Sequence, residues 1–139
     1  MRRVVVDPGV LVSAIITPAG PPAEIVRAAR EGRLELVVSP HLLAELAAVL
    51  AREKFRAYVS VAEAREYVEG LAVLAETIGD PGVTEALARD PADDYLIALA
   101  RASGGSLVSG DADLLVLSGP ELSVLAPRGL LRELESQRS

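Results

Sequence analysis

Short apolar runs alternate with longer stretches of helical pattern along this chain. Residues 3–6, 34–38 and 106–109 are rich in valine and leucine, and each is short enough to be a strand buried on both faces. Residues 122–125 are read as a last strand, and residues 75–78 are a weaker candidate. Because helical patterns separate these runs, the sequence predicts an α/β fold with a parallel sheet that helices cover on both faces.

Helix signals fill most of the intervals between the runs. Ser39-Pro40 supplies a capping residue and a proline at the first helical position, and this helix is expected to reach about Arg52. Ser60 and Glu63 have the spacing of a capping box and open a helix to about residue 75. Further helices are expected over 22–31, over Tyr95–Ala100 with a stop at Gly104-Gly105, over 112–118 and from 127 onward, whereas 10–16 fits either a short helix or a second apolar segment.

Length and composition bound the possible functions. The 139 residues fit a single domain over residues 1–139 with a real core. No stretch approaches the roughly 20 apolar residues of a membrane span, so no membrane partner is expected. The start shows no signal-peptide pattern, and we expect a cytoplasmic location. With no cysteine and only His41, the chain excludes thiol chemistry and sites built from several histidines.

Charge is spread unevenly over the formal net of −6. Residues 1–60 carry 8 basic and 6 acidic side chains, whereas residues 61–139 carry 6 basic and 14 acidic ones. A uniformly basic surface for nucleic acid is therefore absent. The four aromatic residues are too few and too scattered to predict a base-stacking platform: Phe55, Tyr58, Tyr67 and Tyr95.

Acidic residues follow two of the apolar runs. Asp7 comes directly after 3–6, and Asp111 follows 106–109. The carboxyl ends of parallel strands form the functional edge of such a sheet, and Asp93 and Asp94, at a helix start, can face the same edge. Glu45 borders the apolar stripe of its helix. Carboxylates brought together would repel one another unless a divalent cation, Mg²⁺ or Mn²⁺, bound between them.

Each acid also has a purely structural interpretation. Asp7 could cap a turn, Glu45 could be a partly exposed helix residue, and Asp113 could cap the short helix after it. Asp90 or Asp93 could be a plain N-cap. A phosphatase or phosphotransfer enzyme of the same fold class is a further alternative. It is disfavoured because Gly9 stands where a haloacid-type enzyme has a second aspartate.

Several motifs together resemble the PIN-domain family, in particular the VapC-like toxins of toxin–antitoxin systems. They are Val4-Val5-Val6-Asp7, Ser39-Pro40-His41-Leu42-Leu43-Ala44-Glu45-Leu46, the segment from Arg89 to Ala100, and Ser109-Gly110-Asp111-Ala112-Asp113-Leu114-Leu115. The resemblance implies a three-layer α/β/α sandwich around a central, mainly parallel twisted sheet. It also implies an endoribonuclease that depends on Mg²⁺ or Mn²⁺, acts on RNA, often forms a homodimer and is inhibited by a cognate antitoxin.

The resemblance also implies roles for individual acids. Asp7, Glu45, Asp94 and Asp111 match the four catalytic acids, and Asp7, Asp94 and Asp111 would hold the metal. Asp94 matches the aspartate of the family's Asp-x-x-Ile-Ala pattern, with Asp93 as its competitor, and Asp113 matches an auxiliary polar position.

One departure from the family pattern concerns the residues after Asp7. Family members usually have Thr or Ser and then Asn there, whereas this chain has Pro8 and Gly9. The lost hydroxyl and amide would support the metal site less well, at a cost of roughly 10–100-fold in affinity. A weakened or non-catalytic module that binds RNA or protein is therefore the alternative function.

Overall fold

Five parallel strands form the central sheet of the computed structural model, which describes residues 1–137. Their order across the sheet is β3-β2-β1-β4-β5, and every neighbouring pair is parallel. The strands are β1 (Arg3–Val6), β2 (Glu35–Val38), β3 (Glu76–Thr77), β4 (Ser106–Val108) and β5 (Val124–Leu125). This arrangement confirms the predicted parallel sheet.

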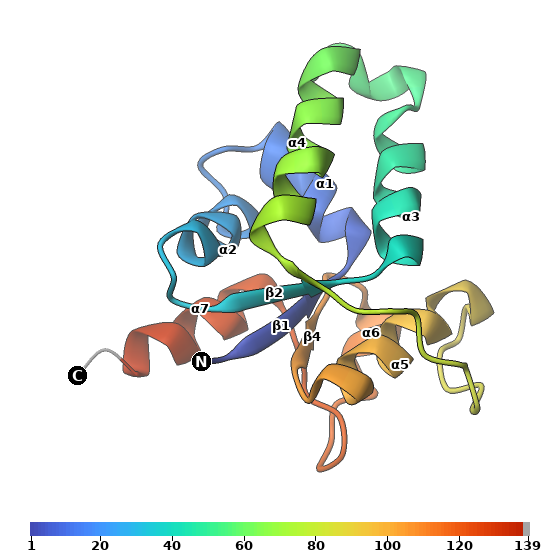
Figure 1. Cartoon of the computed structure of the whole chain (residues 1–139). Helices are drawn as coiled ribbons and strands as arrows, with labels where there is room; N and C mark the ends of the chain where they lie inside the picture. Colours follow the sequence, from blue (N-terminus) through green and yellow to red (C-terminus); the bar gives the residue numbers. More distant parts are fainter. Residues whose placement is uncertain (138–139) are drawn as a thin grey trace.

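Helices cover both faces of this sheet (Figure 1). The α-helices are α1 (Pro8–Ile16), α2 (Pro21–Arg30), α3 (Pro40–Leu50), α4 (Val61–Leu74), α5 (Asp94–Ser103), α6 (Ala112–Leu115) and α7 (Pro127–Ser136). Two 3₁₀ turns, η1 (Glu53–Phe55) and η2 (Pro91–Asp93), were not expected from the sequence. Helices α1 to α4 lie on one side of the sheet and α5 on the other, which confirms the α/β/α sandwich.

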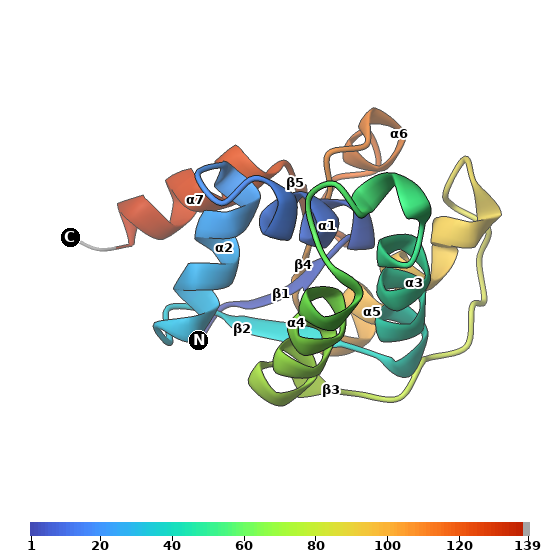
Figure 2. The same cartoon turned by 90° about the horizontal axis from the view of Figure 1, so that it is seen from above.

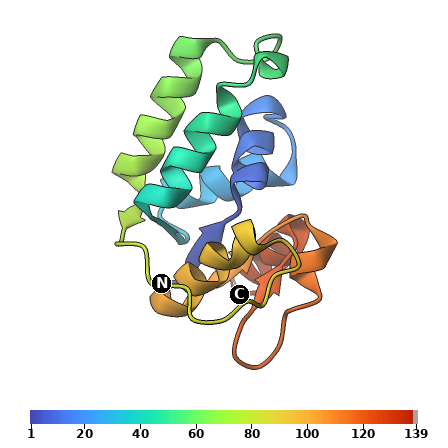
Figure 3. The ribbon, with the colours of Figure 1, turned by 90° about the vertical axis from the view of Figure 1, so that its right-hand side faces the viewer.

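Helices α3 and α4 form an antiparallel arm that extends away from the sheet (Figures 1 and 3). Ser39 begins the first of them, because its hydroxyl accepts a hydrogen bond from the backbone N–H of Leu42 at 3.2 Å. Ser60 and Glu63 form the capping box expected at the start of α4. The Tyr67 hydroxyl donates to the Leu11 carbonyl at 2.7 Å and ties the arm to α1.

The strands of the sheet centre supply the core. Val4, Val5, Val37 and Leu107 are fully buried, as expected for strands covered on both faces. Each such side chain contributes about 1.5–3 kcal/mol by leaving water. In the described part of the chain no single helix is long and apolar enough to cross a membrane, and α1 with α2 reaches that length and composition only across a 95° bend.

Two glycines set the position of β4. Gly104 ends α5 in the left-handed conformation, with φ at 70°. A Cβ atom on Gly105 would lie 2.6 Å from the Arg3 carbonyl oxygen, so only glycine fits this close approach to β1. The consequence is that Val6 of β1 and Val108 of β4 end side by side.

Candidate functional site

Asp7 and Ser109 are adjacent because they follow paired residues of neighbouring strands. The backbone N–H of Asp7 donates to the Val108 carbonyl at 2.9 Å. The Ser109 hydroxyl donates to Asp7 Oδ2 at 2.8 Å and accepts from the backbone N–H of Asp111 at 3.0 Å. Ser109 is completely buried. One buried hydroxyl therefore links the acids that follow β1 and β4.

Asp7 is also the N-cap of α1. Its Oδ1 accepts a hydrogen bond from the Gly9 backbone N–H at 2.9 Å, and Pro8 occupies the first turn, where a missing N–H costs nothing. The Pro8-Gly9 departure therefore leaves the Asp7 carboxylate held at both oxygens. A Cβ on Gly9 would lie 3.5 Å from Asp7 Oδ1, an ordinary contact, so a larger side chain has room there.

Glu45 joins this edge from α3 through a contact with α5. The Tyr95 hydroxyl donates a hydrogen bond to Glu45 Oε2. Burial and this hydrogen bond raise the pKa of the Tyr95 phenol, and the charges of Glu45, Asp7 and Asp93 raise it further. Tyr95 therefore stays protonated and keeps donating to Glu45. In Figures 2 and 3 the sheet-side end of α3 lies near α5.

The neighbouring residues Asp93 and Asp94 face different surroundings. Asp94 is buried, and its Oδ1 accepts hydrogen bonds from the backbone N–H groups of Leu87 and Ala88 at 3.0 and 2.8 Å. It thereby anchors the loop before η2. Asp93 is instead surrounded electrostatically by the other acids of the edge. The two side chains differ in this way because consecutive helical residues point about 100° apart.

The pKa of Asp93 is sensitive to the negative charges of the acids around it. It is raised from 3.8 to about 6, first by partial burial and then by the negative charges of Asp7, Asp90, Asp111 and Glu45. Asp7, Glu45, Asp93 and Asp111 therefore form one negatively charged neighbourhood, which we call the acid cluster. Asp94 differs from these four residues in that its carboxylate binds two backbone N–H groups.

Asp111 and Asp113 lie at the start of α6. Asp111, and not Asp113, caps this helix, because its Oδ1 accepts from the Asp113 backbone N–H at 2.9 Å. The Arg89 guanidinium lies 3.7 Å from Asp113 Oδ1, with both side chains largely in water. Such an exposed pair contributes about 0–1 kcal/mol. Asp113 therefore pairs with Arg89 at the surface, two residues after Asp111.

The donor atoms of the acid cluster suit a hard divalent cation. All are carboxylate oxygens, the ligands that Mg²⁺ and Mn²⁺ prefer. A cation would also relieve the mutual repulsion that raises the Asp93 pKa. Within residues 1–137, no three acidic or histidine side chains already converge on one ion position. The carboxylate oxygens are therefore suitable ligands for a metal ion. In the structure, however, their side chains do not surround a single ion position.

Three contributors to the site were missed by the sequence analysis. Ser109 was included in a motif without a role, Tyr95 was counted only among the scattered aromatic residues, and His41 was noted only as the sole histidine and as part of a motif. The strand register offers a signal for Ser109, because it follows the partner of Val6. No local signal exists for the contacts of Tyr95 with α3, which join residues 50 positions apart.

Comparison with known proteins gives the family. The PIN domain model matches residues 3–113, so this chain belongs to the PIN-domain family. PIN domains are typically nucleases. The chain is also similar to the uncharacterized protein MJ1680 of Methanocaldococcus jannaschii, with 26% identity over 142 residues that cover 96% of this chain and 92% of the relative.

Two solved structures share the fold. PAE2754 from Pyrobaculum aerophilum superposes with a TM-score of 0.67 at 20% identity, over 99% of this chain and 91% of the other. A chain of the VapBC2 complex from Rickettsia felis, solved bound to a DNA fragment from its promoter, superposes with a TM-score of 0.64 at 15% identity. That match covers 88% of this chain and 96% of the other. At 15% and 20% identity, these two similarities show a shared fold and nothing more.

Proposed function

We propose that this protein is a divalent-metal-dependent endoribonuclease and the toxin of a toxin–antitoxin pair. The observation that carries the proposal is the acid cluster, in which three carboxylates from other segments act on Asp93 through their negative charge at the carboxyl edge of a parallel sheet. Membership of the PIN-domain family supports the same chemistry.

In this proposal Asp7, Asp93 and Asp111 hold Mg²⁺ or Mn²⁺, with Asp93 replacing the Asp94 of our sequence-based assignment. When bound, the metal would lower the pKa of a water molecule and stabilise negative charge on the phosphodiester. Ser109 keeps Asp7 and the Asp111 backbone in register. These contacts preorganise two of the three proposed ligands.

Glu45 is assigned to orient the attacking water. Tyr95 engages its Oε2 atom, so the carboxylate has a fixed direction, and Oε1 is assigned to accept a hydrogen bond from the water. Asp113 is auxiliary and acts beside the cluster through its pairing with Arg89.

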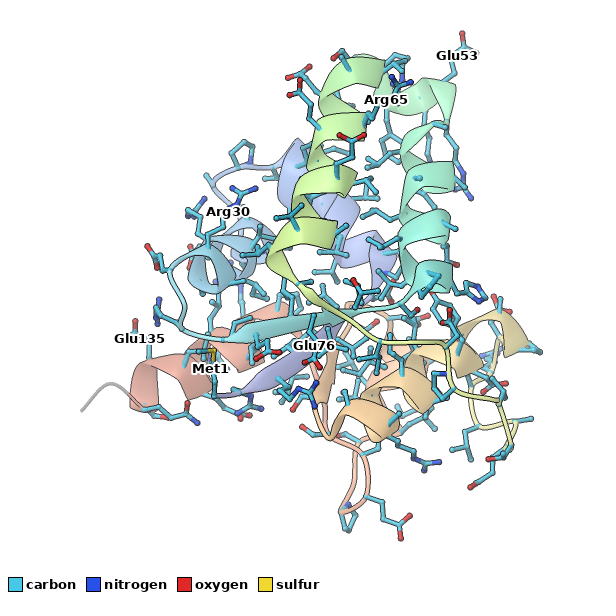
Figure 4. The ribbon with its side chains drawn as sticks, in the orientation of Figure 1. Met1, Arg30, Glu53, Arg65, Glu76 and Glu135 are labelled. Atoms are coloured by element: carbon cyan, nitrogen blue, oxygen red, sulfur yellow. The ribbon has the colours of Figure 1, made fainter. Side chains whose placement is uncertain are left out.

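The test compares wild-type protein with Asp7→Asn on single-stranded and structured RNA, with Mn²⁺, with Mg²⁺ and with EDTA. Glu53→Gln is the matched control, because Glu53 lies at the end of the α3–α4 arm away from the sheet (Figure 4). We expect cleavage by wild-type protein and Glu53→Gln with either ion, and its loss with EDTA or Asp7→Asn. Equal cleavage by wild-type protein and Asp7→Asn would overturn the proposal.

The proposed partners are an antitoxin and a second copy of this chain. Similarity to a chain of the VapBC2 complex supports a protein antitoxin. Toxicity is tested by inducing the chain in a bacterial host, where we expect growth arrest that Asp7→Asn abolishes. Light scattering of the purified protein tests the homodimer, and a monomeric mass over the micromolar range would contradict it.

A non-catalytic PIN module is the second candidate function. It is favoured by Gly9 in place of the family's asparagine and by the open arrangement of the carboxylates. Calorimetry separates the two functions, because a non-catalytic module is expected to bind neither Mg²⁺ nor Mn²⁺ at millimolar concentration. Metal binding that Asp7→Asn removes would exclude it.

A further inference from the structure

The rings of His41 and Tyr95 stack face to face at the border of the acid cluster. Their centroids lie 3.8 Å apart and their planes differ by 7°. Tyr95 is buried, at 6% exposure, whereas His41 is exposed. Tyr95 therefore covers one face of the imidazole, while His41 as a whole residue remains exposed to solvent.

This stacked pair is held from both sides. His41 is the second residue of α3, and its backbone N–H donates to Asp80 Oδ2 at 3.0 Å. Glu45 lies one turn further along the same face of α3 and accepts from the Tyr95 hydroxyl. Little conformational freedom remains to be lost when another ring stacks on His41, which favours binding there.

The pair also contacts the acid cluster that we propose to hold the metal. Tyr95 contacts Glu45 directly, and the charges of Asp7 and Asp93 act on its phenol. The carboxylates of the acid cluster offer no aromatic surface to a base. A phosphate at the proposed metal would therefore bring its flanking nucleotide to the stacked pair.

We propose that the exposed face of His41 stacks on an unpaired nucleobase next to the scissile phosphate and selects single-stranded RNA. The inference rests on the proposed ribonuclease function and adds a substrate contact to it. Bases splayed out of single strands stack on aromatic and histidine side chains, whereas bases within a duplex are already stacked on one another. The ring of His41 offers one stacking position, which would accommodate one unpaired base.

The experiment measures RNA binding in an Asp7→Asn background, which prevents cleavage. The probes are a short single-stranded RNA, its blunt duplex, and a series in which each nucleotide in turn lacks its base. His41→Ala removes the ring, and His41→Phe keeps a flat aromatic surface. Melting temperature is measured for every variant, and Mn²⁺ affinity is measured for His41→Ala, His41→Phe and the wild type with Asp7 intact, to detect a merely structural role.

We expect His41→Ala to weaken single-strand binding by about 5- to 100-fold, the usual loss for one base–aromatic stack. His41→Phe should bind as tightly as the parent within about threefold, since stacking needs only a flat ring. Removal of one particular base should weaken the parent to the level of His41→Ala and leave His41→Ala unchanged. Duplex binding, Mn²⁺ affinity and melting temperature should not differ between the variants.

Two outcomes would overturn the inference alone. In the first, His41→Ala binds single-stranded RNA as tightly as the parent. In the second, His41→Ala and His41→Phe lose binding equally together with Mn²⁺ affinity, which would make His41 a support of the acid cluster. If wild-type protein neither binds nor cleaves any RNA, the proposed function fails together with the inference.

Discussion

The junction after β1 and the junction before α5 both carry acids to the same edge of the sheet, but they fix them differently. Asp7 follows a buried strand, so its position is set by the pairing of β1 with β4. Asp93 and Asp94 lie where a 3₁₀ turn becomes an α-helix, and the phase of that turn decides which one faces the acid cluster. A strand end thus constrains a site residue more tightly than a helix start does.

The two junctions also differ in how their acids are satisfied. Asp7 accepts from Gly9 and Ser109 and still belongs to the cluster. At the second junction, hydrogen bonding to the local backbone and membership of the acid cluster fall to two different residues. Asp94 anchors the preceding loop through two backbone N–H groups, and Asp93 contributes its charge to the cluster.

The largest expected effect separates the adjacent acids of the second junction. Asp93→Ala should reduce Mn²⁺ affinity and RNA cleavage by about 100-fold or more, because loss of a ligand exceeds loss of its support. Asp94→Ala should leave Mn²⁺ affinity within a few-fold and lower the free energy of unfolding by about 1–3 kcal/mol, because two N–H groups lose their acceptor. Calorimetry with Mn²⁺ and urea unfolding measure both quantities. The reverse pattern would restore Asp94 to the site.

The next effect tests the link between the two strand ends. Ser109→Ala removes the hydroxyl that joins Asp7 to the Asp111 backbone. We expect Mn²⁺ affinity to fall by about 10–100-fold and the free energy of unfolding by about 1–2 kcal/mol. Ser109→Thr restores a hydroxyl and serves as the control. If Ser109→Ala binds Mn²⁺ like the wild type, the strand ends are held by pairing alone.

A pH dependence follows from the raised pKa of Asp93. Its folded-state value of about 6 exceeds the ordinary 3.8, so the folded protein holds this proton more tightly than the unfolded chain does. Without metal, the contribution of Asp93 to stability should decline as pH rises from 3.8 through about 6. Mn²⁺ competes with the same proton, so its affinity should increase about tenfold between pH 5 and pH 7. Titration calorimetry across this range measures it, and Asp93→Asn should flatten the profile.

The smallest effect concerns the first junction. Gly9→Asn restores the residue type that family members usually have at this position. The added Cβ would make an ordinary contact with Asp7 Oδ1, and Gly9 has no positive φ, so the helix should accept the change. We expect Mn²⁺ affinity to rise roughly two- to fivefold. Gly9→Ala controls for the gain in helix stability, and an equal gain with alanine would remove the amide from the explanation.

Much of the fold was accessible from the sequence because its signals are local. The valine-rich runs, the Ser39-Pro40 start and the Ser60 capping box all fall where the structure has strands and helix beginnings. The ambiguous residues 10–16 are part of α1, and the short helix expected to residue 118 ends at Leu115. The sequence signals for helix ends are weaker than those for helix beginnings. The observed helix ends therefore differ from the predicted ones by a few residues.

The candidate site was accessible only in part. Asp7 and Asp111 follow strands, so the topology of a parallel sheet predicts their common edge. The choice between Asp93 and Asp94 depends on a rotation of one residue, which composition and spacing do not encode. The contacts of Tyr95 with His41 and Glu45 join two helices that are distant in the sequence, and no local pattern announces them.

The sequence by itself determined the layers of this protein, the strand ends that carry acids and the absence of cysteine and multiple-histidine chemistry. Periodicity and residue type act over a few neighbours, and they suffice for those features. The tertiary structure alone decided which acid of an adjacent pair joins the cluster, that Ser109 connects two strand ends, and that His41 stacks on Tyr95. These three features depend on contacts between α5 and α3 and on the register of β1 with β4. Such contacts join residues that are distant in the sequence, so they exist only in the folded chain.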